Sequence, residues 1–161
     1  MAKMVKVGMA DLNICHSPDA ITTLGLGSCV GVALYDKNTK TAGLVHVMLP
    51  DSTKVRQNQN RAKFADTGID YLIELLEKEG AKKSSLTAKI AGGAQMFAFS
   101  SSNDMLRVGE RNVEAGKDKL KKLGIRVLAE DTGLNYGRTV EFYPETGDFI
   151  IKSVGKPVKT I

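Results

Sequence analysis

Two pairs of short apolar runs, each pair joined by a turn-rich segment, constrain the fold more than any other feature. Residues 29–35 and 42–49 form the first pair, and residues 139–143 and 149–153 form the second. Strand-like runs on either side of a short polar turn are typical of a β-hairpin. The chain is therefore expected to contain two antiparallel hairpins.

Helical spacing is visible in two other segments. Apolar residues recur at this spacing over residues 65–76, with Gly80 as the expected C-cap. They recur again over residues 113–123, with Asn112 as the expected N-cap and Gly124 just past the end. The sequence therefore predicts two helices.

Further strands are predicted by shorter apolar runs at residues 5–7, 86–91 and 125–129. Residues 8–18 are expected to form a loop. Strands thus outnumber helices and come largely in hairpins. This pattern predicts an α+β fold of largely antiparallel, sandwich-like sheets flanked by helices.

The chain is expected to be one domain spanning residues 1–161, because it contains no internal repeat and no linker-like stretch. Its first residues lack the apolar run of a signal peptide. No window approaches the roughly 18 apolar residues that a membrane-spanning helix needs. We therefore expect a cytoplasmic protein, monomeric and not inserted in a membrane.

The net charge of +5 comes from 23 basic and 18 acidic residues. Four lysines gather on the second predicted helix, at positions 117, 119, 121 and 122, while the others are dispersed. Aromatic residues are few and are not interleaved with the lysines, so the basic stripe and stacking surface of a nucleic-acid site are missing. We expect no nucleic-acid partner and interpret the lysines as a solvated helix face.

The two cysteines are expected to be free thiols, as is usual in a reducing compartment. Cys15, His16, Cys29 and His46 would supply two zinc ligands of each type, but their spacing fits no compact zinc finger. Neighbouring residues on a strand also point apart, which separates Cys15 from His16. We therefore expect no metal and no cofactor, and interpret Cys15 and His16 as a surface or packing pair.

Cys29 and His46 lie on the two strands of the first predicted hairpin. With a two-residue turn at 37–38 the two residues are directly opposed, and with a turn at 38–39 they are diagonal on the same face, roughly 7–8 Å apart. A register with an even sum of paired residue numbers would place them on opposite faces. On the shared face, Gly31 and Ala33 are expected to leave room for a substrate.

A thiol beside an imidazole has the minimum chemistry for acyl transfer. The imidazole accepts the proton of the thiol and later returns a proton to the leaving group. The pair predicts Cys29 as nucleophile and His46 as base. Both residues also have ordinary structural interpretations, because a lone cysteine is commonly a small core residue and a lone strand histidine a satisfied core group.

The glycine-rich run before the cysteine suggests the remaining parts of such a site. Its glycines permit a bend that exposes the backbone N–H groups of Ser28 and Cys29, which are our candidates for binding an oxyanion. The same bend brings Thr23 toward His46, so that the hydroxyl of Thr23 can accept a hydrogen bond from the ring N–H of His46. The run misses the dinucleotide-binding spacing by one residue, and Val30 breaks the serine nucleophile elbow.

Several segments together make the chain resemble the CheD family of chemoreceptor glutamine deamidases. The resemblance covers nearly the whole chain and is specific as an ordered set. Its segments are Thr23–Val30, His46–Pro50, Ile90–Phe97, Gly109–Asn112, and Gly137–Arg138 after Asp131. One departure is Leu134, which stands where the family usually has a glycine.

The resemblance implies an activity and partners. Such proteins convert particular glutamines of methyl-accepting chemoreceptors to glutamates with release of ammonia, and they bind the CheC-type phosphatase. The family's catalytic cysteine, histidine and threonine fall on Cys29, His46 and Thr23, and its fold is similar to bacterial glutamine-deamidating toxins. A docking protein with weak catalysis is the alternative function. Our candidate residues for partner binding are Gly92, Gly93, Met96 and Phe97.

Overall fold

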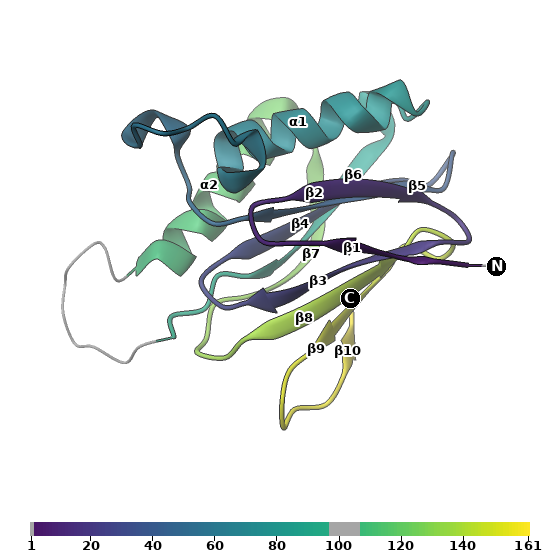
Figure 1. Ribbon diagram of the computed structural model, residues 1–161. Helices are drawn as coiled ribbons and strands as arrows, with labels where there is room; N and C mark the ends of the chain where they lie inside the picture. The colour runs from purple at the N-terminus through teal and green to yellow at the C-terminus, as the bar shows by residue number, and fades with distance from the viewer. Residues whose placement is uncertain (1, 97–106) are drawn as a thin grey trace.

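The computed structural model describes residues 2–96 and 107–161, which form two five-stranded sheets and two helices (Figure 1). The first sheet has the strand order β1 (Met4–Val7), β3 (Ala20–Leu26), β8 (Arg138–Tyr143), β9 (Asp148–Lys152) and β10 (Lys159–Thr160). The second has the order β2 (Leu12–His16), β5 (Thr41–Val47), β4 (Val30–Asp36), β6 (Leu86–Gly92) and β7 (Arg126–Thr132). The helices are α1 (Ala65–Lys78) and α2 (Val108–Leu123), with short 3₁₀ turns at Ser52–Lys54, Arg61–Lys63 and Lys83–Ser85.

Most neighbouring strands are antiparallel, as the hairpin pattern predicts. The parallel pairs among the described strands are β1 with β3 and β6 with β7, so both sheets are mixed. Both predicted hairpins are present, as β4–β5 and β8–β9. The predicted α+β architecture is therefore confirmed, with the helices covering one face of the second sheet (Figure 1).

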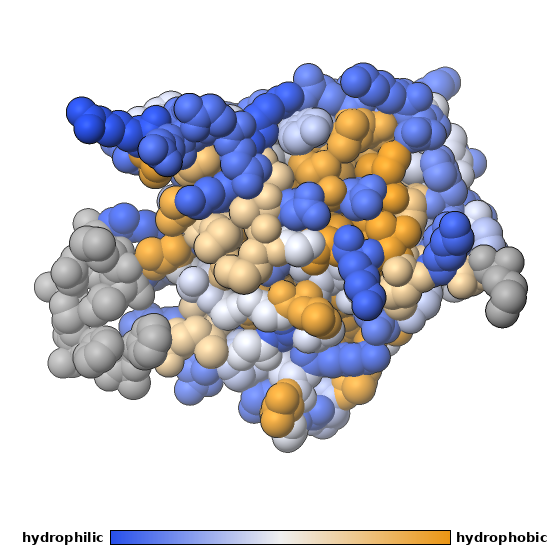
Figure 2. All heavy atoms as spheres, viewed as in Figure 1, coloured by the Kyte–Doolittle hydropathy of each residue, from blue (hydrophilic) through white to orange (hydrophobic). Residues whose placement is uncertain are grey.

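Strand β4 contributes alternate residues to two separate cores, as the two-residue period of a strand requires. Val30, Val32 and Leu34 face the helices and pack with apolar residues of α1. Ala33 faces the first sheet and belongs to the core between the two sheets. In the space-filling view, hydrophilic side chains cover α1 while apolar side chains gather in the layer below it (Figure 2).

The expectation of open space above Gly31 and Ala33 is wrong. A Cβ atom at Gly31 would lie 3.2 Å from Leu26 and 3.6 Å from Leu44, and Ala33 is fully buried. The physical reason is that the first sheet packs on this face of the second sheet. Cys29, which precedes β4, is therefore not reached across Gly31 and Ala33.

The sequence does not predict three of the strands, which are β2, β3 and the two-residue β10. Residues 8–18 contain β2, and β3 occupies part of the segment that we interpreted as a glycine-rich bend. β2 is only five residues long, and two threonines and a glycine interrupt the apolar run of β3, so neither shows a clear pattern. The bend itself is shorter, because β3 continues to Leu26 and β4 begins at Val30.

Asn112 is not the N-cap of the second helix. Helix α2 begins at Val108, so Asn112 lies inside it, and its side chain is fully buried. The other end agrees with the prediction, because Gly124 follows the helix with a φ of 74°. The lysines of this helix make exposed ion pairs, Lys117 with Glu130 and Lys119 with Asp70, both at 2.8 Å.

Leu134 adopts a left-handed backbone conformation, with a φ of 61°. This conformation costs a residue with a side chain roughly 1–2 kcal/mol relative to glycine. The residue is well exposed, so its side chain recovers little of this cost by burial. The loop after β7 therefore keeps a backbone suited to glycine at this position.

Within the described part of the chain, neither helix combines the length and the apolar character that crossing a bilayer requires.

Candidate active site

The register of the first hairpin places Cys29 and His46 on the same face of the second sheet. Gly31 pairs with His46 and Val30 with Val47, the register expected for a turn at residues 38–39, although the connection itself has four residues, 37–40. Cys29 immediately precedes β4, so His46 is its diagonal neighbour across the hairpin. Of the two favourable registers considered above, the structure has the diagonal one. Both side chains face the first sheet.

Thr23 comes to this pair from the first sheet. Its strand, β3, packs over the hairpin, and its Oγ1 lies 2.7 Å from Nδ1 of His46. Thr23 is 1% exposed and His46 is 0% exposed, so no water competes for this hydrogen bond. The site is therefore assembled between the two sheets.

The hydrogen bonds of Thr23 determine which ring nitrogen of His46 carries the proton. Thr23 Oγ1 lies 2.8 Å from the carbonyl oxygen of Val7, and a carbonyl cannot donate, so the hydroxyl donates its single hydrogen to Val7. The hydroxyl must then accept from Nδ1–H of His46. This leaves Nε2 without a proton. Within residues 2–96 and 107–161, Nε2 is buried and has no hydrogen-bond partner.

Burial keeps both reacting groups uncharged. It lowers the pKa of His46 below its ordinary value of 6.5, and it raises the pKa of Cys29 above its ordinary value of 9.0. The backbone N–H of Cys29 acts in the opposite direction on the thiol, but less strongly. At neutral pH the site therefore holds a thiol and a neutral imidazole, and forming the thiolate requires transfer of its proton.

The carbonyls of Gly27, Ser28 and Cys29 accept hydrogen bonds from helix α2 and the turn after β6. The N–H of Ala94 donates to Gly27 O at 2.8 Å, the N–H of Gly93 to Cys29 O at 2.9 Å, and the side-chain amide of Asn112 to Ser28 O at 3.0 Å. Among the described residues, the N–H groups of Ser28 and Cys29 have no backbone acceptor, and the Cys29 N–H acts on its own thiol. The oxyanion role expected of these two groups stays a prediction.

The turn after β6 depends on two glycines. Gly92 and Gly93 have φ angles of 108° and 69°, and a Cβ atom at Gly92 would collide with the carbonyl of Cys29. The Gly93 carbonyl points toward helix α2, because a Cβ at Gly109 would lie 2.6 Å from it. This carbonyl is therefore not available to Cys29 N–H.

Arg138 also holds this turn through hydrogen bonds, a role that no local sequence pattern indicates. Its side chain is completely buried and donates to the carbonyls of Gly92 and Gly133, at 3.4 and 3.1 Å, and to Asp131 at 3.2 Å. The only sequence signal for this role was the position of Arg138 and Asp131 within the resemblance described above. A buried arginine with a carboxylate partner makes the turn rigid.

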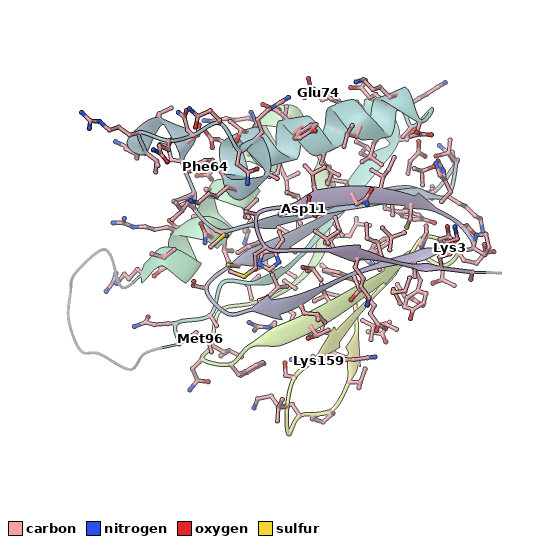
Figure 3. All side chains as sticks on the ribbon, in the orientation of Figure 1. Lys3, Asp11, Phe64, Glu74, Met96 and Lys159 are labelled. Carbon is pink, nitrogen blue, oxygen red and sulfur yellow. The ribbon has the colours of Figure 1, made fainter. Side chains whose placement is uncertain are left out.

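Among the residues proposed for partner binding, Gly92 and Gly93 are buried, and Phe97 lies outside the described residues. Met96 is 46% exposed and contacts Gly27, at the end of the molecule where β3 ends (Figure 3). Contact with a CheC-type phosphatase stays a prediction, and Met96 is its described candidate.

The remaining zinc candidates do not join this site. Cys15 is buried on β2, and the imidazole of His16 lies 3.4 Å from the Glu79 carboxylate. Over residues 2–96 and 107–161, no three histidine, cysteine or acidic side chains cluster so as to hold a metal ion.

The two thiols are expected to differ in their alkylation by iodoacetamide. Cys29 is 7% exposed and burial raises its pKa above 9.0, whereas burial and the Asp19 carboxylate raise the pKa of Cys15 to about 12. Because the thiolate is the reacting form, Cys29 should react faster near neutral pH, and its rate should still rise as the pH passes 9. Peptide mass spectrometry over a pH series measures both rates, and equally slow labelling would contradict this difference.

The chain is similar to known proteins over its whole length. The family model described as "CheD chemotactic sensory transduction" matches residues 48–153. A relative from Lachnoclostridium phytofermentans, named probable chemoreceptor glutamine deamidase CheD, is 70% identical over the full length of both chains. The chemoreceptor glutamine deamidase CheD of Bacillus subtilis is 50% identical and covers 99% of this chain and 97% of its own.

A third relative, the chemoreceptor glutamine deamidase CheD of Halalkalibacterium halodurans, is 57% identical over the full length of both chains. Among solved structures, the Bacillus licheniformis hypothetical protein YfiH matches 72% of this chain and 47% of its own, with 14% identity and a TM-score of 0.45. By the family model and by these full-length relatives, the chain belongs to the CheD family.

Proposed function

We propose that this chain deamidates glutamine side chains of chemoreceptors in bacterial chemotaxis, with Cys29 as nucleophile and His46 as base. The full-length relatives that carry this activity in their names support the reaction. The observation that carries the residue assignment is the unpartnered, buried Nε2 of His46 on the face of Cys29. A basic nitrogen without a partner in a dry site is poised to accept a proton.

The first half of the reaction forms a thioester. The sulfur of Cys29 attacks the carboxamide carbon of glutamine, and its proton passes to Nε2 of His46. The carbon–nitrogen bond then breaks as the imidazolium returns the proton to the departing nitrogen, which leaves as ammonia. Thr23 holds the ring through Nδ1, so that Nε2 keeps its direction while its charge changes.

The second half releases glutamate. Water attacks the thioester carbon while His46 accepts its proton, and the thiol of Cys29 is regenerated. In both halves a tetrahedral intermediate carries a negative oxygen. The N–H groups of Ser28 and Cys29 are the proposed donors to that oxygen, which backbone donors stabilise by several kcal/mol in a water-excluded site.

Thr23 is a weaker partner for an imidazolium than a carboxylate would be. A neutral hydroxyl orients the ring but does not compensate its positive charge. We therefore expect a modest turnover. Such a rate suits an enzyme that adjusts a receptor population and does not process a metabolite.

The proposal is tested by incubating the protein with a purified cytoplasmic fragment of a chemoreceptor. Mass spectrometry should detect glutamine converted to glutamate, together with release of ammonia. Added hydroxylamine should divert part of the product to the γ-glutamyl hydroxamate, because it intercepts a thioester. Absence of conversion would refute the activity, whereas conversion without hydroxamate would refute the thioester.

A further inference from the structure

Asn112 connects the two strands of the candidate site through one side-chain amide. Its Nδ2 donates to the carbonyl of Ser28 and to that of Met48, both at 3.0 Å. Ser28 directly precedes Cys29, and Met48 follows His46 by two residues. Helix α2 thus holds the end of each strand that carries a reacting side chain.

The bond to Ser28 has a consequence for the neighbouring amide. In a planar trans peptide the carbonyl and the following N–H point in opposite directions. With Ser28 O held toward helix α2, the N–H of Cys29 must point away from the helix. The bond from Ala94 N–H to Gly27 O likewise makes the N–H of Ser28 point away from the turn after β6.

The packing around Asn112 leaves this amide little freedom. A Cβ at Gly109, one turn earlier in α2, would lie 2.5 Å from Ala94 O, so the helix and the turn after β6 are in close contact. The Oδ1 of Asn112 is buried without a partner among the described residues. An unpaired buried acceptor is unfavourable, so packing alone does not account for an asparagine here.

From these contacts we infer that Asn112 is a positioning residue for the deamidation. It holds the Ser28–Cys29 peptide so that the N–H of Cys29 faces the oxygen of the tetrahedral intermediate. It also ties this peptide to the end of the strand that bears His46. This inference rests on the proposed function, and it adds a residue that the cysteine, histidine and threonine do not include.

The experiment compares two reactions of Cys29 in Asn112→Ala and Asn112→Leu. Leucine has nearly the same shape as asparagine but donates no hydrogen bond to the two carbonyls. Both variants should lose deamidation by about 10- to 100-fold in kcat with KM nearly unchanged, since the lost donor acts on the transition state. Alkylation of Cys29 by iodoacetamide should stay near the wild-type rate, because this displacement forms no oxyanion.

Leu120→Ala serves as the structural control. Leu120 is buried on the same helix but belongs to the core under the helices, whereas Cys29 belongs to the core between the sheets. The variant should lower the melting temperature and leave kcat near the wild-type value.

Asn112→Ser is the further variant if either substitution at Asn112 prevents folding. The inference is wrong if alkylation falls in parallel with deamidation, or if Asn112→Leu keeps the wild-type kcat. Activity retained by Cys29→Ala would instead refute the proposed function.

Discussion

Replacing Cys29 by alanine is expected to abolish conversion of receptor glutamine to glutamate, with a loss on the order of 10⁵- to 10⁶-fold in kcat. The sulfur is the atom that forms the covalent bond, and no neighbouring side chain in the described structure replaces it. Ser28 is adjacent, but hydrogen bonds hold the peptides on both of its sides. The carbonyl of Gly27 accepts from the turn after β6, and the carbonyl of Ser28 accepts from Asn112. Mass spectrometry of a receptor fragment after a fixed incubation measures the remaining activity.

The matched control is the other cysteine. Cys15 is 4% exposed on β2, and Cys15→Ala should keep wild-type deamidation while costing about 1 kcal/mol of folding free energy. Thermal unfolding of both variants separates loss of chemistry from loss of structure. Substantial glutamine conversion by a folded Cys29→Ala protein would show that Cys29 is not the nucleophile.

Replacing His46 by alanine is expected to reduce kcat by about 10⁴-fold or more. Burial holds the Cys29 pKa above 9.0, so without a base the thiol stays protonated at neutral pH. The pH profile identifies the base. The pKa of His46 lies below 6.5, so wild-type activity should persist as the pH falls through 6.5 and should decline only below it.

The residual activity of His46→Ala should lack this decline at acid pH and should rise with pH as hydroxide forms the thiolate. His16→Ala is the matched control, because this second histidine is exposed and pairs with Glu79. It should retain both the rate and the acid limb of the wild-type profile. An unchanged acid limb in His46→Ala would assign the titration to another group and would contradict the role of His46.

Some features of the site can be predicted from the sequence because they are local. The alternation of apolar residues along the first hairpin has a period of two, and a two-residue turn makes the sum of paired residue numbers odd. An odd sum places Cys29 and His46 on one face of the hairpin, but the sequence alone does not exclude an even sum. These two properties do not choose between the opposed and the diagonal pairing, because both turn positions are equally polar.

Other features were wrong or missing because they depend on what packs against the hairpin. The space expected above Gly31 is filled by Leu26, which belongs to a strand of the other sheet. The sequence predicts Asn112 as a helix cap, since asparagine before an apolar run is typical of that position. Its two acceptors lie 84 and 64 positions away along the chain, beyond any local pattern.

The α+β fold and the first hairpin follow from the sequence, because periodicity and turn length act over a few residues, and they make a shared face for thiol and imidazole one of the expected outcomes. The register of the hairpin, the proton position on His46 and the buried supports Asn112 and Arg138 come from the packing of the folded chain. The proton position and the supports follow from contacts between segments distant along the chain, and the choice of packing partner leaves no periodic trace in the sequence.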